Sequence, residues 1–287
     1  AQIMKYYNYP TTGIGSHTYT PYTFGTTYGE LTADFGATTY NWTSMLSTLV
    51  DYNSEVATIL YHTGVSLEMN YSPNRSGANV SFAAVKALKT YFGYSASVHF
   101  KYRYSYDSGE WLTLLRNELD NHRPVLYRGS GDQGAHSFIC DGYAAGEQGN
   151  NDYFHFNWGW GGYLDGYFYL DDLTPDNQNY NSLQGGVFGI SPSCPEGSEG
   201  QPCDDGDACT TEDTCLDGIC AAGPPLDCDD SNSCTSDSCD LINGCVNVCS
   251  ATSQNDSCCK DETCNVTSVC KDFSWLMFMP AIIGGSN

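Results

Sequence analysis

The chain of 287 residues has 34 acidic and 11 basic residues, which gives a formal net charge of −23. This charge excludes nucleic acid as a partner and disfavours anionic lipid, because both would repel an acidic surface. The longest apolar run, Phe273–Ile283, is interrupted by Ser274 and Pro280. It is too short to cross a bilayer, so we expect no membrane span.

The distribution of cysteine divides the chain into two parts. Residues 1–193 contain Cys140 alone, and residues 194–287 contain the other fourteen of the 15 cysteines. A segment so rich in cysteine and so poor in large apolar residues needs disulfides or metal to fold, and disulfides indicate an oxidising compartment. We therefore expect a domain over residues 1–193, a small disulfide-rich module over residues 194–287, and a secreted or extracellular protein.

The chain begins with AQIMKYYNYP, which has no initiator Met, no basic region and no apolar core of signal-peptide length. Because a secreted protein is made with a signal, we expect the chain to be a processed form or a fragment. The same segment is expected to form the end of a helix that Pro10 stops.

Apolar spacing predicts four helices in the first half of the domain and five strands in the second. The expected helices are Trp42–Val50, Glu55–Thr63, Asn79–Phe92 and Glu110–Leu119. The expected strands are Val125–Tyr127, Ser137–Asp141, Tyr153–Trp158, Gly166–Leu170 and Val187–Ile190. Residues 11–40 are expected to form loops and short strands. Helices followed by strands predict an α+β domain in which a helical layer packs on an antiparallel sheet.

Two motifs in the strand region carry candidate chemistry: GAHSFICDGY around His136, and FHFNWGWGGYLDGYFYL from Phe154 to Leu170. A cysteine peptidase needs a base beside its nucleophile and a third group that orients the imidazole. Asn157 suits the third role, because its carbonyl can accept the imidazole N–H without adding a full charge. Trp158 would shield that hydrogen bond from water. The alternative for His136 is a structural role in the core.

Residues 1–192 resemble the streptopain family of papain-like cysteine peptidases. Besides the two motifs, the resemblance rests on AQIMKYYNYP, GIGSHTYT, the Tyr40–Asn41–Trp42 triplet, GVSLEMNYSP, ALKTYFGY and RPVLYRG. It implies a papain-like fold, a protein or peptide substrate, and an endopeptidase that uses a Cys–His mechanism without a cofactor. His136 would be the catalytic base, Asn157 its orienting partner and Trp158 the aromatic cover.

The resemblance also implies a substrate site built from backbone. Gly77 and Ala78 would present their main chain to an extended peptide, and Ala135 would do so from the opposite wall. Two positions depart from the family pattern. Ala135 stands where the family commonly has glycine, and Arg128 stands where the type member has an uncharged polar residue. Both departures concern substrate preference.

The family's nucleophile lies at the start of the helix whose later part reads AQIMKY. It is therefore expected upstream of Ala1, where the helix N-terminus and a nearby imidazolium would stabilise a thiolate. The 287-residue chain is then expected to be inactive. Cys140 is roughly 13 Å from His136 along the same predicted strand, at about 3.3 Å per residue. We expect Cys140 to be a buried apolar residue, and His17 and His155 to have structural roles.

The cysteine-rich tail contains two similar units, Cys203–Cys220 and Cys228–Cys245, and a degenerate third. Fourteen cysteines allow seven disulfides, whose connectivity the sequence does not determine. Its acidic residues favour either simple solubility or Ca²⁺ binding at two clusters. These are Asp204, Asp205 and Asp207, and then Asp229, Asp230 and Asn232. Zinc is disfavoured, because Cys-x-x-Cys pairs are missing from the repeats and His-Glu-x-x-His from residues 1–193.

Two rival functions stay open at this point. One is a non-catalytic extracellular binding protein on a degenerate peptidase fold. The other makes the cysteine repeats the main functional part, as an adhesion module with an extracellular partner. The identity of the residue upstream of Ala1 separates the enzyme from the first rival.

Overall fold

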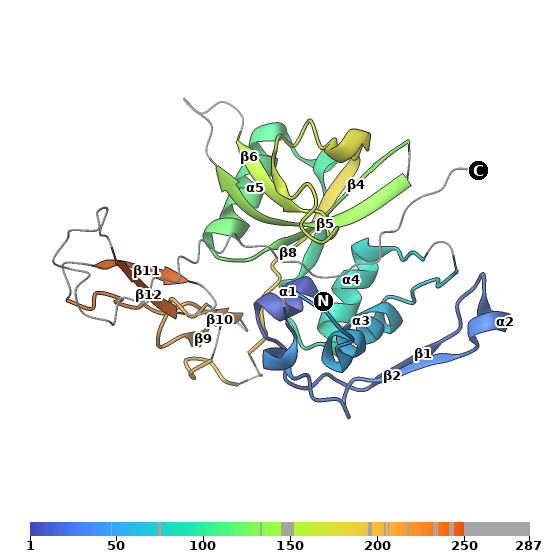
Figure 1. Ribbon diagram of the computed structural model, residues 1–287, viewed down its shortest axis with the longest axis horizontal. Coiled ribbons are helices and arrows are strands. Elements are labelled where there is room, and N and C mark those ends of the chain that lie inside the picture. The colour runs from blue at the N-terminus through green and yellow to red at the C-terminus, as the bar shows by residue number, and fades with distance from the viewer. Residues whose placement is uncertain are drawn as a thin grey trace. The chain divides into compact units, whose positions relative to one another are not determined.

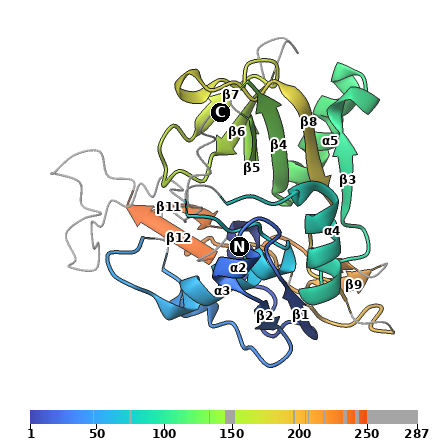
Figure 2. The ribbon, with the colours of Figure 1, turned by 90° about the vertical axis from the view of Figure 1, so that its right-hand side faces the viewer.

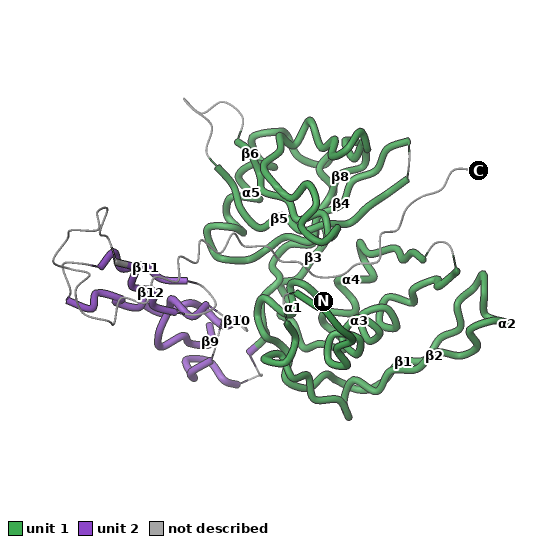
Figure 3. The backbone as a smooth tube through the Cα atoms, viewed as in Figure 1, with its two compact units in different colours: residues 1–193, 274–287 green, residues 194–273 purple. Residues whose placement is uncertain are grey.

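The computed structural model describes residues 1–249 except 47, 74–75, 133, 145–151, 195–196, 204, 206, 217–218, 232–234 and 241–243. The described residues divide between Ser193 and Cys194 into two compact units, which Figure 3 shows in different colours. This boundary coincides with the change in cysteine content along the sequence. Within the described part of the chain, no helix has the length and apolar character needed to cross a membrane.

The first unit begins with a layer of helices. These are α1 (Gln2–Tyr6), α3 (Ser54–Ser66) and α4 (Val80–Tyr91), and a hairpin of β1 (Ser16–Tyr19) and β2 (Leu31–Asp34) extends from them. Figure 1 shows the short helix α2 (Gly25–Tyr28) at the far end of that hairpin. The side chain of Asn53 caps α3 by accepting the N–H of Val56 at 3.0 Å.

A six-stranded antiparallel sheet follows, with the strand order β3-β8-β4-β5-β6-β7. Its strands are β3 (His99–Tyr102), β4 (Val125–Gly131), β5 (Gly134–Ala144), β6 (Tyr153–Asn157), β7 (Gly166–Phe168) and β8 (Ser182–Phe188). Helix α5 (Ser108–Asp120) begins with a capping box between Asp107 and Glu110. Figure 2 shows the sheet turned so that its strands are seen side by side. The α+β class and the antiparallel sheet confirm the sequence-based expectation.

Both faces of this sheet are apolar. Alternate residues point to opposite faces of a strand, so Tyr127, Phe138 and Phe156 share one face and pack with Trp111 and Leu115 of α5. The other face carries Leu126, Ile139 and Val187, which pack against the helical layer. The sheet is therefore covered by α5 on one side and by α1, α3 and α4 on the other.

One local prediction is wrong, and one strand was not predicted. The expected helix over Trp42–Val50 is only a 3-10 turn at Trp42–Ser44, and Met45 is already extended. The indole Nε1–H of Trp42 donates to the carbonyl of Pro10 at 2.8 Å. The apolar residues of this segment are therefore buried in a loop, although their spacing resembles that of a helix. Strand β3 was not anticipated. It is an edge strand of four residues held by pairing with β8, a contact that sequence periodicity does not report.

The second unit contains two small hairpins and four described disulfides. The hairpins pair β9 (Thr214–Leu216) with β10 (Ile219–Ala221) and β11 (Thr235–Asp240) with β12 (Gly244–Cys249). The disulfides are Cys194–Cys215, Cys203–Cys220, Cys209–Cys239 and Cys228–Cys245. In each repeat the first cysteine bonds to the last with a separation of 17 residues, and Cys209–Cys239 joins the two repeats.

We expect chemical reduction to unfold the second unit and to leave the first one folded. Each short-loop disulfide stabilises a fold by about 2–4 kcal/mol, and residues 1–193 contain only the buried thiol of Cys140. Amide hydrogen exchange with and without dithiothreitol, read peptide by peptide, measures this. A tail that keeps its protection after full reduction, or a mass-spectrometric crosslink from Cys140 into the tail, would contradict the expectation.

Candidate active site

The two candidate catalytic side chains come from neighbouring strands. His136 lies near the start of β5, opposite Gly129 of β4, and Asn157 ends β6, opposite Ile139. A Cβ at Gly129 would lie only 2.1 Å from the carbonyl oxygen of Tyr180. Glycine is therefore required at that position, and it lets the segment around Tyr180 pack close to His136.

The imidazole of His136 lies among aromatic rings. It stacks on Trp160 with centroids 5.3 Å apart and planes at 18°, and its centroid lies 5.5 Å from that of Tyr180. Its Nε2 is 2.8 Å from the carbonyl oxygen of Trp158. Because a carbonyl only accepts, Nε2 carries the proton, and the neutral ring then has Nδ1 free of hydrogen to act as the base.

Burial lowers the pKa of His136 below its ordinary value, and the hydrogen bond to the carbonyl of Trp158 opposes this shift. The ring is therefore mostly neutral near pH 7, which is the form that can accept a proton. The arrangement suits a general base and leaves a definite atom, Nδ1, for that role.

Asn157 is almost completely buried, with 2% of its surface exposed. Its Oδ1 accepts the backbone N–H of Gly159 at 2.9 Å and the amide N–H of Gln2 at 3.3 Å. Gln2 belongs to the first turn of α1, so this bond brings the start of that helix to the candidate site. That Asn157 orients His136 stays a prediction.

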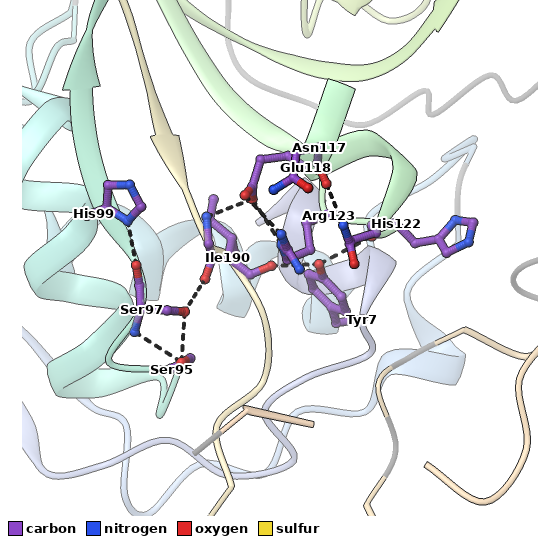
Figure 4. Close-up of polar contacts among 11 residues, drawn as sticks. Tyr7, Ser95, Ser97, His99, Asn117, Glu118, His122, Arg123 and Ile190 are labelled. Atoms are coloured by element: carbon purple, nitrogen blue, oxygen red, sulfur yellow. Dashed lines mark hydrogen bonds and ion pairs between the residues drawn. The ribbon is translucent and has the colours of Figure 1, made fainter. Parts of the chain in front are cut away.

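Helix α1 is held in this place by a polar network at its other end, which Figure 4 shows. The hydroxyl of Tyr7 donates to the carbonyl of Ile190 at 2.6 Å. The nearby carboxylate of Glu118 accepts the backbone N–H of Gly189 at 2.8 Å and pairs with Arg123 at 3.0 Å. These bonds link α1, α5 and the end of β8, and they fix the helix whose first turn meets Asn157.

Trp158 is fully buried and is held at three points. Its backbone N–H donates to Oδ1 of Asp165 at 2.9 Å, its indole N–H donates to the carbonyl of Leu164 at 3.0 Å, and its own carbonyl holds His136. Burial raises the pKa of Asp165, while the hydrogen bond from Trp158 lowers it. Asp165 therefore positions the backbone that positions His136.

Sequence reasoning missed Trp160, Tyr180 and Asp165. The stacking of Trp160 on His136 was not anticipated, because the sequence does not report which rings meet. The role of Trp158 as the cover of a hydrogen bond stays a prediction. The sequence could have indicated a role for Asp165, since it is the only carboxylate in the glycine-rich segment between Trp158 and Tyr169.

The other histidines singled out are paired with carboxylates. Nδ1 of His155 lies 2.5 Å from Oδ1 of Asp141, and this hydrogen bond raises the pKa of His155. Nε2 of His17 lies 3.1 Å from the carboxylate of Glu68. Neither contact involves His136 or Asn157.

The candidate substrate-binding residues lie on two different elements. Gly77 forms a bridge with Asn70, and a Cβ added to Gly77 would meet no atom within 4 Å. Ala78 follows it, just before α4, and Ala135 is exposed on β5 next to His136. The open space at Gly77 suits close approach of another backbone. Substrate binding by these three residues stays a prediction.

Cys140 is fully buried on β5 among the aromatic residues that face α5. Burial raises the pKa of its thiol well above the ordinary value. An un-ionised, inaccessible thiol is a poor nucleophile. The expectation that Cys140 is a buried apolar residue is confirmed.

Several acidic residues of the tail accept backbone N–H groups. Asp207 accepts the N–H of Cys209 at 2.8 Å, and Asp229 accepts the N–H of Ser231 at 2.7 Å. Carboxylates of Asp229, Asp230 and Asp237 lie within 4.8 Å of one another. Asp204 and Asn232, the remaining members of the expected calcium clusters, lie outside the described residues. Calcium binding in the tail stays a prediction.

We expect nuclear magnetic resonance (NMR) titration to give His136 a pKa below its ordinary value of about 6.5. Protonation of this ring then destabilises the fold as the pH falls below about 6.5, because the unfolded state binds the proton more readily. Asp165→Ala removes the acceptor for the N–H of Trp158, so water gains access and the pKa of His136 rises towards the ordinary value. Asp51→Ala, at an exposed position, is the control. A wild-type pKa at or above 6.5 would contradict this account.

Comparison with known proteins gives a consistent result. The sequence profile of the peptidase C10 family matches residues 1–168. Streptopain of Streptococcus pyogenes is 36% identical over 207 residues, which are 67% of this chain and 50% of the relative. The thiol protease/hemagglutinin PrtT of Porphyromonas gingivalis is 33% identical over 207 residues, 68% of this chain and 23% of the relative. The chain thus spans about half the length of streptopain.

Solved structures of similar proteins support the same conclusion. The active wild-type interpain A cysteine protease of Prevotella intermedia superimposes with a TM-score of 0.58 at 35% identity, covering 66% of this chain and 79% of the other. A prointerpain A fragment gives a TM-score of 0.55 at 34% identity, covering 67% and 61%. The expected papain-like fold is confirmed by these neighbours. Together with the profile match over most of the first unit, they show that the chain belongs to the peptidase C10 family of cysteine peptidases.

Proposed function

We propose that the protein is a secreted endopeptidase that cleaves peptide bonds through a cysteine thiolate and His136. The observation that carries this proposal is the state of the His136 ring. Its Nε2 donates to the carbonyl of Trp158, and burial lowers its pKa, so Nδ1 is an available base near pH 7.

The thiolate in this proposal comes from a residue that precedes Ala1 in the full-length protein. A cysteine at the start of the helix that continues into α1 would lie near Asn157, because Gln2 contacts Asn157 at 3.3 Å. The positive end of the helix dipole would favour the ionised thiol. The buried Cys140 does not serve this role.

The reaction follows from these roles. Nδ1 of His136 first takes the proton of the cysteine thiol, which gives a thiolate and an imidazolium. The thiolate attacks the carbonyl carbon of the scissile bond, and the imidazolium gives this proton to the leaving amine as the C–N bond breaks. His136 then removes a proton from water, whose oxygen attacks the thioester. The acid product leaves, and the thiolate is restored. The carbonyl of Trp158 holds the imidazole in orientation by accepting its Nε2–H. Asn157, whose Oδ1 accepts the N–H of Gly159 and the amide N–H of Gln2, would support that orientation through the neighbouring main chain, and the buried Trp158 would exclude water from it.

The substrate would bind in extended form. Main-chain groups of Gly77 and Ala78 on one side and of Ala135 on the other would pair with the backbone of the peptide. The open space beside Gly77 and the exposure of Ala135 support this role. Secretion is supported by the four disulfides, which form in oxidising compartments. An extracellular partner of the tail stays a prediction.

The proposal is tested with the full-length gene product and with the 287-residue chain. We expect the full-length protein to hydrolyse casein in a way that iodoacetamide blocks, and His136→Ala to lower kcat by about 10²–10⁴-fold through loss of acid–base catalysis. Asn157→Ala should cause a smaller loss. His155→Gln, which changes a histidine paired with Asp141, is the matched control.

Three results would contradict the proposal. Iodoacetamide-sensitive cleavage by the 287-residue chain would show that the nucleophile lies within it. Full activity of a His136→Ala variant, with its fold verified by circular dichroism, would show that His136 is not the base. A full-length protein that binds peptides without cleaving them would favour a non-catalytic binding protein on this fold.

A further inference from the structure

Three of the four arginines in the described part of the chain are paired with carboxylates. Arg103 lies 2.6 Å from Asp171, Arg123 lies 3.0 Å from Glu118, and Arg116 pairs with the buried Asp152. The fourth, Arg128, has one described hydrogen bond. Its Nη1–H donates to the neutral hydroxyl of Ser81 at 3.1 Å.

The position of Arg128 links the two proposed halves of the site. On β4 it lies opposite Ser137 and directly before Gly129, whose partner across the strands is His136. Ser81, which is 2% exposed, lies in the first turn of α4, shortly after Gly77 and Ala78. Arg128 shares the face of β4 with Leu126, and Gly129 and His136 lie on the opposite face. The guanidinium therefore reaches from β4 towards the helical layer, to the helix that follows the proposed substrate-binding loop.

No carboxylate among the described residues pairs with the guanidinium of Arg128. The side chain is only partly exposed, and a charge removed from water is costly unless an opposite charge compensates it. The chain has 34 acidic residues, and each of the other three described arginines pairs with one of them. Among the described residues, Arg128 has no such partner. With Ser81 accepting from Nη1, the remaining N–H groups of the planar fork are available to a carboxylate from outside the chain.

We propose that Arg128 selects peptide substrates that carry an Asp or Glu side chain close to the bond that is cleaved. The side-chain carboxylate accepts two N–H groups of the guanidinium and balances its charge. This inference rests on the proposed peptidase function and names the substrate class of the same site. Arg128 is a specificity residue, whereas His136 carries out the proton transfers.

The test is cleavage of a proteome-derived peptide library by the full-length protein, with the cleaved bonds identified by mass spectrometry. At one position beside the bond, we expect Asp and Glu to be preferred over Asn and Gln by about 10-fold or more, as for a hydrogen bond between charged groups. Arg128→Gln should abolish this preference, and Arg128→Glu should shift it towards Lys and Arg. Lys86→Gln, which removes a positive charge from an exposed position of α4, should leave the preference unchanged.

A second measurement does not depend on activity. In the 287-residue chain, the NMR signal of the Arg128 Nε–H group should shift on addition of N-acetyl-glutamate amide and not of N-acetyl-glutamine amide. If the library is not cleaved at all, the proposed function fails and this titration decides the role of Arg128. Cleavage without an acidic preference, a preference that survives Arg128→Gln, a preference only for a C-terminal carboxylate, or an Arg128 signal that ignores the glutamate derivative would overturn the inference.

Discussion

The six-stranded sheet is apolar on both faces, and the arrangement of the first unit follows from the need to cover both. On one face Phe138 and Phe156 need α5, and on the other Ile139 and Val187 need the helical layer. Covering the second face brings α1 against the sheet, where Gln2 reaches Asn157. The candidate site thus forms where the first turn of α1 meets the strand ends, and the packing of the helical layer on the sheet brings them together.

At that meeting point, the chemistry depends on the exclusion of water. Aromatic rings surround His136 and depress its pKa, while the carbonyl of Trp158 selects one tautomer. A carbonyl can do this only if its own peptide is held still, and Asp165 holds it through the N–H of Trp158. The defined tautomer of His136 therefore depends indirectly on Asp165, a carboxylate that accepts the N–H of Trp158. Such indirect support is typical of sites that keep geometry within a fraction of an ångström.

Over its described residues, the second unit is stabilised by disulfides and not by a large apolar core. These residues include few large buried side chains, and the strands of the unit are three to six residues long. Disulfides within each repeat and one between the repeats replace a core, since they lower the entropy of the unfolded chain. The abundant acidic residues then organise the loops by accepting backbone N–H groups, as Asp207 and Asp229 do.

The sequence by itself determined what depends on neighbouring residues and on motif chemistry. Periodicity located α3, α4, α5 and the cores of β4, β5, β6 and β7, and the motifs around His136 and Asn157 identified the family. The strand expected over Val187–Ile190 overlaps β8 only at Val187 and Phe188. Only the tertiary structure decided the features that depend on residues far apart in the chain. The apolar spacing of Trp42–Val50 proved to serve a loop that contacts Pro10, and β3 exists because β8 pairs with it. The cysteine pairs, the stacking of Trp160 on His136 and the bond from Arg128 to Ser81 likewise depend on which surfaces meet, and a one-dimensional pattern does not contain that information.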